Sequence, residues 1–393
     1  PESGSTAKRA RGRRSERTTH RTPRSSRHAE ERSGTAGAYR CPVRRSPMTL
    51  AALATAALPQ LDVVAARTPH HEGSDFAVAA IVDSAGRRWI VRCPTTPTAG
   101  AAMEGEVALL ERLAAAVDDG ALPFAVPRPA GFAPLLEGGR AMVYPELPGE
   151  PIELDALTPG PRLAAELGRA VAAIHELPSA LVETAGLPVY DAEEIRRRRL
   201  AEVDEASRTG AVPHTLLDRW ERALENVGLW RFRATPVHGD LAPDHVLVAD
   251  DRVEAIVDWS HAHVGDPADD LAWLVATAPE PAVESILEAY SLARAERGDV
   301  HLAARATLGG ELAVARWLLH GVRTSDDATV RDARSMLAEL AELLGDAPPI
   351  GPVAPRVAPG PADGAQLDSD PVPSSESGAS EPEDGEESPT RPI

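Results

Sequence analysis

Cysteine is scarce in this sequence of 393 residues: only Cys41 and Cys93 occur, and they do not form a Cys-x-x-Cys motif. Two such residues give no disulfide framework, so we expect a reducing compartment, the cytoplasm. Long apolar runs are also missing, because no stretch approaches the ~20 apolar residues that a membrane-spanning helix needs. We therefore expect no membrane partner. The length and the 43% of hydrophobic residues still suffice for two lobes with real cores.

The net charge of −19 is unevenly distributed along the chain. Residues 1–47 contain thirteen Lys and Arg against four carboxylates, whereas residues 346–393 are rich in Pro, Ser, Asp and Glu. Neither segment has enough apolar residues to offset the entropy of ordering, so we expect a disordered basic extension and a disordered acidic tail. The part between them carries about −20, which argues against a nucleic-acid partner for the folded core.

Residues 235–272, TPVHGDLAPDHVLVADDRVEAIVDWSHAHVGDPADDLA, place carboxylates and imidazoles at the ends of two short apolar runs. Asp240 follows the first run, His245 comes five residues later, and Asp258 ends the second run. This spacing suits phosphoryl transfer, in which one group orients an attacking hydroxyl and others hold Mg²⁺ against the nucleotide phosphates. A single Asp after a strand is as readily a turn former, but the ordered set favours a catalytic site.

Each residue of this set has an expected part in the chemistry. Asp240 is the predicted catalytic residue, which accepts a hydrogen bond from the substrate hydroxyl and aims it at the γ-phosphate. Asp258 is predicted to bind Mg²⁺, and His245 a second Mg²⁺ through neutral nitrogen, although Mg²⁺ prefers oxygen ligands. His238 is interpreted as a brace for the catalytic loop, and Asp270 as a buried carboxylate that holds the loop backbone.

The ordered set of His-Gly-Asp, then His245, then Ile-Val-Asp-Trp resembles the protein-kinase-like antibiotic phosphotransferases. Within that group it is most similar to the macrolide 2'-phosphotransferases, which share a His at the position of His245 and the Gly-Asp-Pro-x-x-Asp-Leu-Ala pattern of residues 265–272. The resemblance implies an α+β, bilobal protein-kinase-like fold. Residues 48–147 would form a small nucleotide-binding N-lobe with an antiparallel sheet and one helix. Residues 148–345 would form a larger, mainly helical C-lobe with the catalytic and substrate-binding residues.

The expected N-lobe contains further candidate residues. Phe76–Val82 and Trp89–Val91 are β-type runs joined by a turn at residues 83–86, which predicts a hairpin. The resemblance implies that Arg92 meets the nucleotide phosphates and that its partner is Glu106, with Glu104 as the alternative. Residues 141–147 form an apolar run broken by Pro145, which favours an edge or a hinge. In kinase-like folds the nucleotide base binds there, so the candidates for cofactor binding include Met142, Tyr144 and Glu146.

Helical patterns dominate the expected C-lobe, at residues 161–177, 192–206, 216–229 and 267–344. His175 near the end of the first helix is interpreted as a core or capping residue rather than a catalyst.

The basic extension has three interpretations. Its charge would suit contact with nucleic acid or an anionic membrane. Arg44 and Arg45 precede a short Ala/Leu run, as in a signal peptide, but the positive region is far too long for one. The resembling enzymes begin near a run like the one that Met48 opens, so residues 1–47 are expected to lie upstream of the true start, with that run as a helix that caps the N-lobe.

The sequence thus predicts a Mg²⁺-dependent enzyme that moves the γ-phosphate of GTP or ATP to a hydroxyl of a small-molecule antibiotic. The resemblance favours the 2'-hydroxyl of a macrolide amino sugar. An aminoglycoside or a small amino alcohol stays open as the acceptor, because an acidic lobe attracts any cation. A non-catalytic nucleotide-binding pseudokinase is the alternative outside the enzymes. The choice between ATP and GTP and the oligomeric state do not follow from the sequence.

Overall fold

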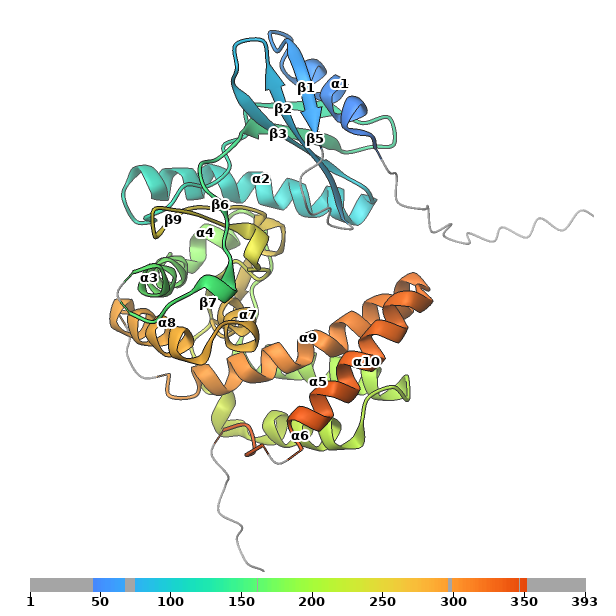
Figure 1. Cartoon of the computed structure of the whole chain (residues 1–393), viewed down its shortest axis with the longest axis vertical. Coiled ribbons are helices and arrows are strands. Elements are labelled where there is room, and N and C mark those ends of the chain that lie inside the picture. Colours follow the sequence, from blue (N-terminus) through green and yellow to red (C-terminus); the bar gives the residue numbers. More distant parts are fainter. Residues whose placement is uncertain (1–44, 68–74, 161, 296–298, 346, 352–393) are drawn as a thin grey trace, which may run out of the picture.

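The computed structural model describes residues 45–67, 75–160, 162–295, 299–345 and 347–351. It has two lobes: a β-sheet with two helices lies above a larger, mainly helical body (Figure 1). The predicted α+β, bilobal fold is confirmed. Of the two segments predicted to be disordered, 1–47 and 346–393, residues 1–44, 346 and 352–393 lie outside the described residues, as does Cys41.

The N-lobe is built on a five-stranded antiparallel sheet with the order β1-β2-β3-β5-β4. The strands are β1 (Val63–Arg67), β2 (Phe76–Asp83), β3 (Arg88–Pro94), β4 (Gly131–Pro134) and β5 (Arg140–Pro145). Asp83 stabilises the predicted hairpin turn, since its Oδ1 accepts hydrogen bonds from the backbone of Ala85 and Arg87. Side chains of a strand alternate between faces, so the sheet has a core on each side.

Helix α1 (Pro47–Ala57) covers one face of the sheet and helix α2 (Pro97–Asp118) the other. The run that Met48 opens thus forms the predicted capping helix, α1. The N-lobe therefore has two helices, α1 and α2, where the fold prediction gave it one. Ser46 caps α1 by accepting from Thr49 N at 3.2 Å, and Arg45 donates to Pro94 O and pairs with Glu137. The expected boundary after Pro47 therefore falls inside the folded N-lobe.

The chain passes between the lobes just after β5, at residues 146–149. Gly149 has φ +97°, and a Cβ there would lie 3.0 Å from the backbone nitrogen of Val248. This close approach lets β6 (Glu150–Pro151) pair with β8 (Val246–Ala249), which pairs in turn with β9 (Arg252–Ile256). A second small sheet joins β7 (Thr235–Val237) to β10 (His263–Gly265). The two sheets place the loops after β7 and β9 next to each other.

Helices make up the rest of the C-lobe in two groups (Figure 1). The first packs below α2 and the small sheets, and the second forms a separate core with Trp220, Leu312 and Leu318. The first group is α3 (Leu163–His175), α4 (Ser179–Glu183), α7 (Asp269–Thr277) and α8 (Glu280–Ala293); the second is α5 (Ala192–Arg208), α6 (His214–Glu225), α9 (Leu302–Thr324) and α10 (Asp327–Leu343). Short 3₁₀ helices are η1 (Leu154–Ala156), η2 (Val227–Trp230), η3 (Pro243–His245) and η4 (Trp259–His261).

The end of the described chain belongs to the second core. Ile350 is buried in it, and Arg219 Nη1 donates to Pro348 O at 2.5 Å. The C-lobe thus extends past the expected boundary after Gly345. Among the described helices, none has the length and apolar character that crossing a membrane requires.

Candidate active site

The loop that follows β7 is held from beneath by a buried carboxylate. Asp270, at the start of α7, accepts hydrogen bonds from His238 N and Gly239 N, both at 2.8 Å. Burial alone would raise the pKa of Asp270, but His175, His238 and the Gly239 amide outweigh it and lower that pKa. His175 is buried between Asp270 and the Tyr290 hydroxyl. The predictions of a loop-holding Asp270 and of a core His175 are confirmed.

His238 connects the catalytic loop to the end of β9. Its Nδ1 lies 3.3 Å from Asp240 N and accepts that hydrogen bond, so Nε2 carries the proton that is donated to Val257 O at 2.9 Å. Burial lowers the pKa of His238 to about 4, which keeps the ring neutral. The side chain braces two loops and lies beneath the site, as predicted.

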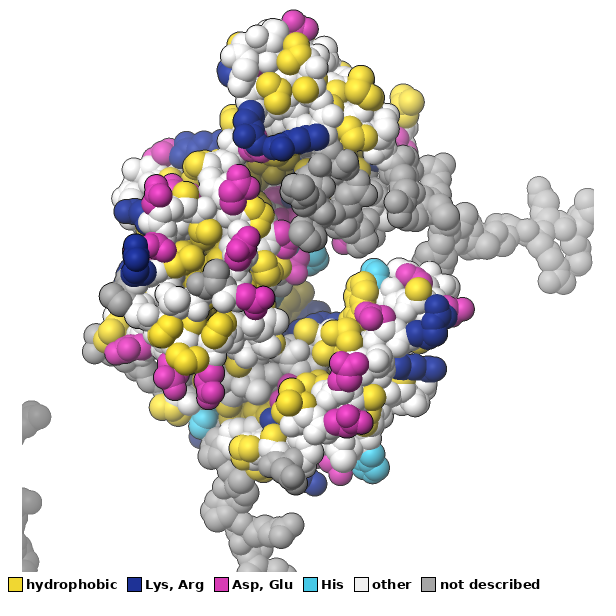
Figure 2. All heavy atoms as spheres, in the orientation of Figure 1, with side chains coloured by type: hydrophobic (Ala, Val, Ile, Leu, Met, Phe, Trp, Pro, Cys, Tyr) yellow, Lys and Arg dark blue, Asp and Glu magenta, His cyan; other side chains and the backbone are white. Residues whose placement is uncertain are grey.

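Asp240 itself is open to solvent, with half of its side chain exposed. Partial burial still raises the pKa of Asp240, and nearby Asp258 adds to this, while His245 and His261 act in the opposite direction. The carboxylate thus lies at the surface, on a loop that Asp270 and His238 hold through its backbone. In the space-filling view the molecule is hollowed between the N-lobe and the α9–α10 hairpin, and acidic and histidine side chains lie on the wall of this recess (Figure 2).

His245, at the end of η3, presents one ring nitrogen toward Asp258. Its Nδ1–H donates to the backbone oxygen of Asp240 at 2.6 Å. Because that nitrogen carries the proton, Nε2 has a free lone pair, and it lies 3.7 Å from Asp258 Oδ2. A backbone carbonyl that fixes the tautomer in this way is typical of histidines that bind metals.

Asp258 stands between the two lobes in a left-handed backbone conformation, with φ 64°. A residue other than Gly is uncommon there, and such strain concentrates at functional sites. Its Oδ1 accepts from Arg92 Nη2 and, at 2.7 Å, from the Ser260 hydroxyl. Burial would raise the pKa of Asp258, but the charge of Arg92 and the Ser260 hydrogen bond outweigh burial and lower it, and Oδ2 is directed at His245.

Arg92 links both lobes through its guanidinium group. It is 3% exposed, donates through Nη1 to Glu106 and through Nη2 to Asp258, and stacks 3.6 Å from the ring centre of Phe76. Glu106, buried on α2, also accepts from Trp259 N at 3.1 Å. Glu104 instead pairs with Arg140 near the surface. The alternative partner for Arg92 is therefore wrong, and Glu106 is the residue in contact.

The three candidates on β5 differ in position. Met142 and Tyr144 are buried and lie on the same face of the sheet as Arg92, which pairs with Met142 across the strands. Pairing between β4 and β5 ends at Val143, and Pro145 has no N–H to donate, so the strand edge opens there. The carboxylate of Glu146 binds Arg88 and Arg67 instead of joining this face. The Glu146 amide also donates to Arg88 O at 3.0 Å, so both the side chain and the N–H of Glu146 are occupied by other contacts.

Two residues that contact the carboxylates of the site are not anticipated from the sequence. His261 Nδ1 lies 3.6 Å from Asp240 Oδ2, and Ser260 contacts Asp258. The only sequence signal is that Ser260 and His261 directly follow Asp-Trp. Their direction toward the two carboxylates depends on η4, which no periodicity reveals.

The described residues contain no group of three or more His, Cys, Asp or Glu side chains that could hold a metal ion. The two predicted ligands nevertheless fit Mg²⁺ bound to a nucleotide. Asp258 Oδ2 and His245 Nε2 converge at 3.7 Å, and Mg²⁺ is usually held by one or two protein ligands, with phosphate oxygens and water completing the shell. The carboxylate is the better ligand of the two, because Mg²⁺ prefers oxygen.

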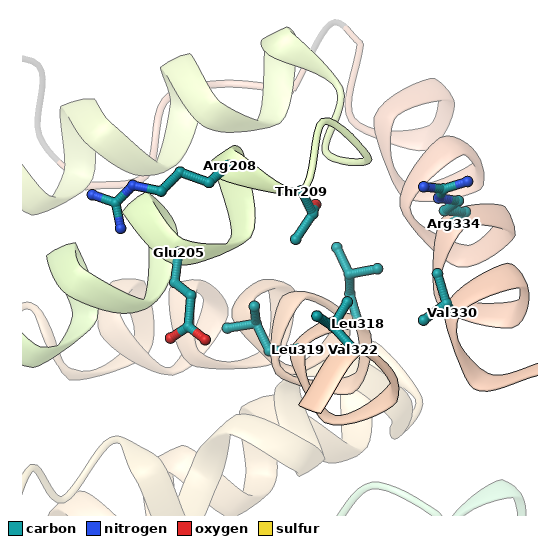
Figure 3. Close-up of a pocket in the computed structure, with 8 residues that line it drawn as sticks. All are labelled: Glu205, Arg208, Thr209, Leu318, Leu319, Val322, Val330 and Arg334. Carbon is teal, nitrogen blue, oxygen red and sulfur yellow. The ribbon is translucent and has the colours of Figure 1, made fainter. Parts of the chain in front are cut away.

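A cavity of about 410 Å³ lies elsewhere, between α5, α9 and α10 (Figure 3). Its floor is apolar, with Leu318, Leu319, Val322 and Val330, and its rim carries Arg208 and Arg334. It contains none of the candidate site residues, so the candidate site is the region around Asp240, His245 and Asp258 and not this cavity.

A buried Arg–Glu pair that touches a carboxylate at the lobe junction, next to a braced loop Asp, defines a phosphotransferase of the kinase-like type. The chain belongs to the phosphotransferase enzyme family, whose family model matches residues 66–306. The predicted family and the prediction of an enzyme are confirmed.

Solved structures of macrolide 2'-phosphotransferases are similar to this chain. The apoenzyme of MphH from Brachybacterium faecium is 29% identical, with a TM-score of 0.63 over 73% of this chain and 97% of that one. The type I macrolide 2'-phosphotransferase is 26% identical, with a TM-score of 0.62 over 76% and 99%. The GDP complex of wild-type aminoglycoside 2'-phosphotransferase-IIIa is 20% identical, with a TM-score of 0.64 over 75% and 98%, a likeness of fold.

Among curated proteins, YcbJ of Bacillus subtilis (strain 168), described as uncharacterized, is 25% identical over 224 residues. The match covers 56% of this chain and 73% of YcbJ.

Proposed function

We propose that this protein transfers the γ-phosphate of GTP or ATP, with Mg²⁺, to the 2'-hydroxyl of a macrolide amino sugar, and so confers resistance. The observation that carries the proposal is the convergence of Asp240, His245 and Asp258 beside the Arg92–Glu106 pair. The reaction would take place in the cytoplasm, where the nucleotide is available.

The donor would lie between the lobes, with its base against the open edge after Val143 and its phosphates near Arg92. Arg92 suits this position because its planar fork binds oxygens bidentately. It already uses two nitrogens for Glu106 and Asp258, so its orientation is fixed before any ligand arrives. Residues 48–147 would thus supply the nucleotide-binding lobe and residues 148–345 the catalytic and acceptor-binding lobe.

Asp240 would accept a hydrogen bond from the acceptor hydroxyl and direct its oxygen at the γ-phosphorus. As the new O–P bond forms and the bond to the β-phosphate oxygen breaks, the hydroxyl proton passes to Asp240. Positioning is the main contribution of the protein in such a loose transition state. The raised pKa of Asp240 favours late acceptance of this proton.

Asp258 would hold one Mg²⁺ and His245 a second one, and bound metal would offset the charge on the phosphate oxygens. The contribution of the chain is orientation. Arg92 and Ser260 occupy Asp258 Oδ1 and leave Oδ2 free, while the Asp240 carbonyl fixes the tautomer of His245.

The macrolide acceptor is supported by sequence identity. MphH and the type I macrolide enzyme are 29% and 26% identical to this chain. The kanamycin complex of APH(2")-IIIa, by contrast, is 19% identical. An aminoglycoside is the second candidate, because a lobe with net negative charge attracts polycations.

One experiment tests the proposal. Purified protein is incubated with Mg²⁺ and either GTP or ATP, and with a panel of macrolides, aminoglycosides and small amino alcohols, and products are weighed by mass spectrometry. We expect the mass of one phosphate to be added to macrolides only. Phosphate on aminoglycosides alone would reassign the acceptor, and no phosphorylated product from any acceptor would reject the proposal.

A further inference from the structure

The catalytic carboxylate has a histidine neighbour that the proposed reaction does not yet use. His261 Nδ1 lies 3.6 Å from Asp240 Oδ2, and both side chains face solvent, with 55% and 50% exposed. This distance is short enough for an ion pair and too long for a hydrogen bond. Contacts of this kind at active sites tighten when the substrate arrives.

The backbone of His261 is fixed against the catalytic loop. His263 Nδ1–H donates to His261 O at 2.8 Å, and Ala262 N donates to Trp259 O at 3.1 Å. A Cβ on Gly239 would lie 2.5 Å from His261 O and 3.0 Å from the ring of His263. Loop and histidine are therefore in direct contact at the residue that precedes Asp240, and they keep their relative position.

The neighbours of His261 also determine which ring nitrogen carries the proton. Nδ1 lies 3.4 Å from Ser260 Oγ, and that hydroxyl donates its own proton to Asp258 Oδ1. Ser260 Oγ then has only lone pairs to offer on this side, as a carboxylate oxygen does, so the proton of His261 lies on Nδ1, which faces both Ser260 Oγ and Asp240 Oδ2. The imidazole thereby connects the two carboxylates of the site.

We propose that His261 is a positioning residue, which holds Asp240 Oδ2 through Nδ1–H so that Oδ1 faces the acceptor hydroxyl. It takes no proton from the acceptor and binds neither nucleotide nor metal. Without it, the exposed carboxylate of Asp240 is free to rotate, since His238 and Asp270 contact the loop backbone and not this carboxylate. The role rests on the proposed function, because it concerns the alignment of the same attacking hydroxyl.

The test compares His261→Leu with His261→Asn, whose amide nitrogen can occupy the place of Nδ1. His214→Leu is the matched control, because His214 on α6 also pairs with a carboxylate, Asp218 at 3.0 Å, and is 86% exposed outside the site. We expect His261→Leu to lower kcat about ten-fold with KM values for both substrates nearly unchanged. The expected loss is smaller than the ~10²-fold fall in rate that a full misplacement of a reacting group would cause. His261→Asn should recover most of the loss, and His214→Leu should match the parent.

Three kinetic results would overturn the role: an unchanged kcat in His261→Leu, a rise in the acceptor KM alone, or equal losses in the Leu and Asn variants. A crystal structure of His261→Leu decides the matter independently of the reaction. We expect the Asp240 side chain in more than one rotamer there, against one in the parent. A single unchanged rotamer refutes the positioning role even if the parent phosphorylates no acceptor, an outcome that would by itself reject only the proposed function.

Discussion

Three histidines around the catalytic loop have different roles because their partners differ. His238 accepts at Nδ1 and donates at Nε2, which makes it a neutral brace. His245 donates at Nδ1 to a carbonyl, so its Nε2 keeps a free lone pair. His175 uses both ring nitrogens for hydrogen bonds inside the core, to Tyr290 and Asp270. The role of each imidazole depends on the hydrogen-bond partners of both its ring nitrogens. Spacing along the sequence does not reveal these partners.

The two principal carboxylates should fail in different ways when they are changed to amides. Asp240→Asn keeps the shape and loses the charge that aligns the nucleophile, so turnover should fall by ~10²- to 10⁴-fold with nucleotide affinity nearly unchanged. Asp258→Asn removes an anionic ligand, so Mg²⁺-nucleotide should bind more weakly and excess Mg²⁺ should recover part of the activity. Calorimetry and steady-state kinetics measure both. Parent-like Mg²⁺-nucleotide binding by both variants would exclude Asp258 as the metal ligand.

His238 should make stability depend on pH. Its pKa is about 4 in the folded state against an ordinary 6.5, so only the unfolded chain takes up this proton between these values. The free energy of unfolding should therefore fall as the pH drops from about 6.5 to about 4, on the order of 3 kcal/mol in all. In His238→Gln this part of the pH dependence should vanish, while stability at pH 7.5 is lower. Denaturant unfolding of both proteins at pH 7.5 and 5 measures this pH dependence. If the free energy of unfolding falls by the same amount in the parent and in His238→Gln, the prediction is refuted.

At the scale of elements, four short segments of the chain supply the residues of the site. The loop after β7 carries Asp240, η3 carries His245, the end of β9 delivers Asp258, and β3 brings Arg92 from the other lobe. Short strands and 3₁₀ turns have few internal hydrogen bonds, so tertiary contacts hold them. Asp270 and Glu106 supply these contacts to backbone amides of Gly239 and Trp259.

The crossover between the lobes gives a prediction about Gly149. Gly149→Ala should destabilise in two ways, because its φ of +97° disfavours a side chain and a Cβ would press on the β8 backbone. Gly138→Ala is the matched control, since Gly138 has φ +100° with nothing within 4 Å of its Cβ position. We expect about 1–2 kcal/mol of lost stability for Gly138→Ala and a further ~1–3 kcal/mol for Gly149→Ala. Denaturant unfolding measures the difference. Equal losses of stability in the two variants would show that the β8 backbone can shift to accept the added Cβ.

At the scale of the whole molecule, the sequence predicts well what is local. Asp240, His245 and Asp258 lie within nineteen residues, and their order alone indicated the class of chemistry. Arg92 and Glu106 are remote from them, and only a resemblance placed them together. His261 could not be predicted, because its direction depends on contacts with Gly239 and His263. The folded part extends past both predicted boundaries, because composition does not reveal a single helix cap such as Ser46 or a single buried side chain such as Ile350.

These ends give a prediction about truncation. Residues 45–351 should melt and turn over nearly as the full chain does, because residues 1–44 and 352–393 lack the apolar content to build a core. Residues 48–345 should be less stable. This shorter chain loses the Ser46 cap, worth ~1 kcal/mol, the contacts of Arg45 with Pro94 and Glu137, and the burial of Ile350, worth ~1.5–3 kcal/mol.

Thermal melts and transfer assays on the full chain and both truncations make the comparison, with two mixed truncations, 45–345 and 48–351, separating the ends. The loss in residues 48–345 should equal the sum of the losses in the mixed forms, because α1 and the second C-lobe core share no residues. Equal stability of 45–351 and 48–345 would show that the cap and Ile350 contribute nothing measurable. A large loss in 45–351 would show instead that one of the removed ends binds the folded core.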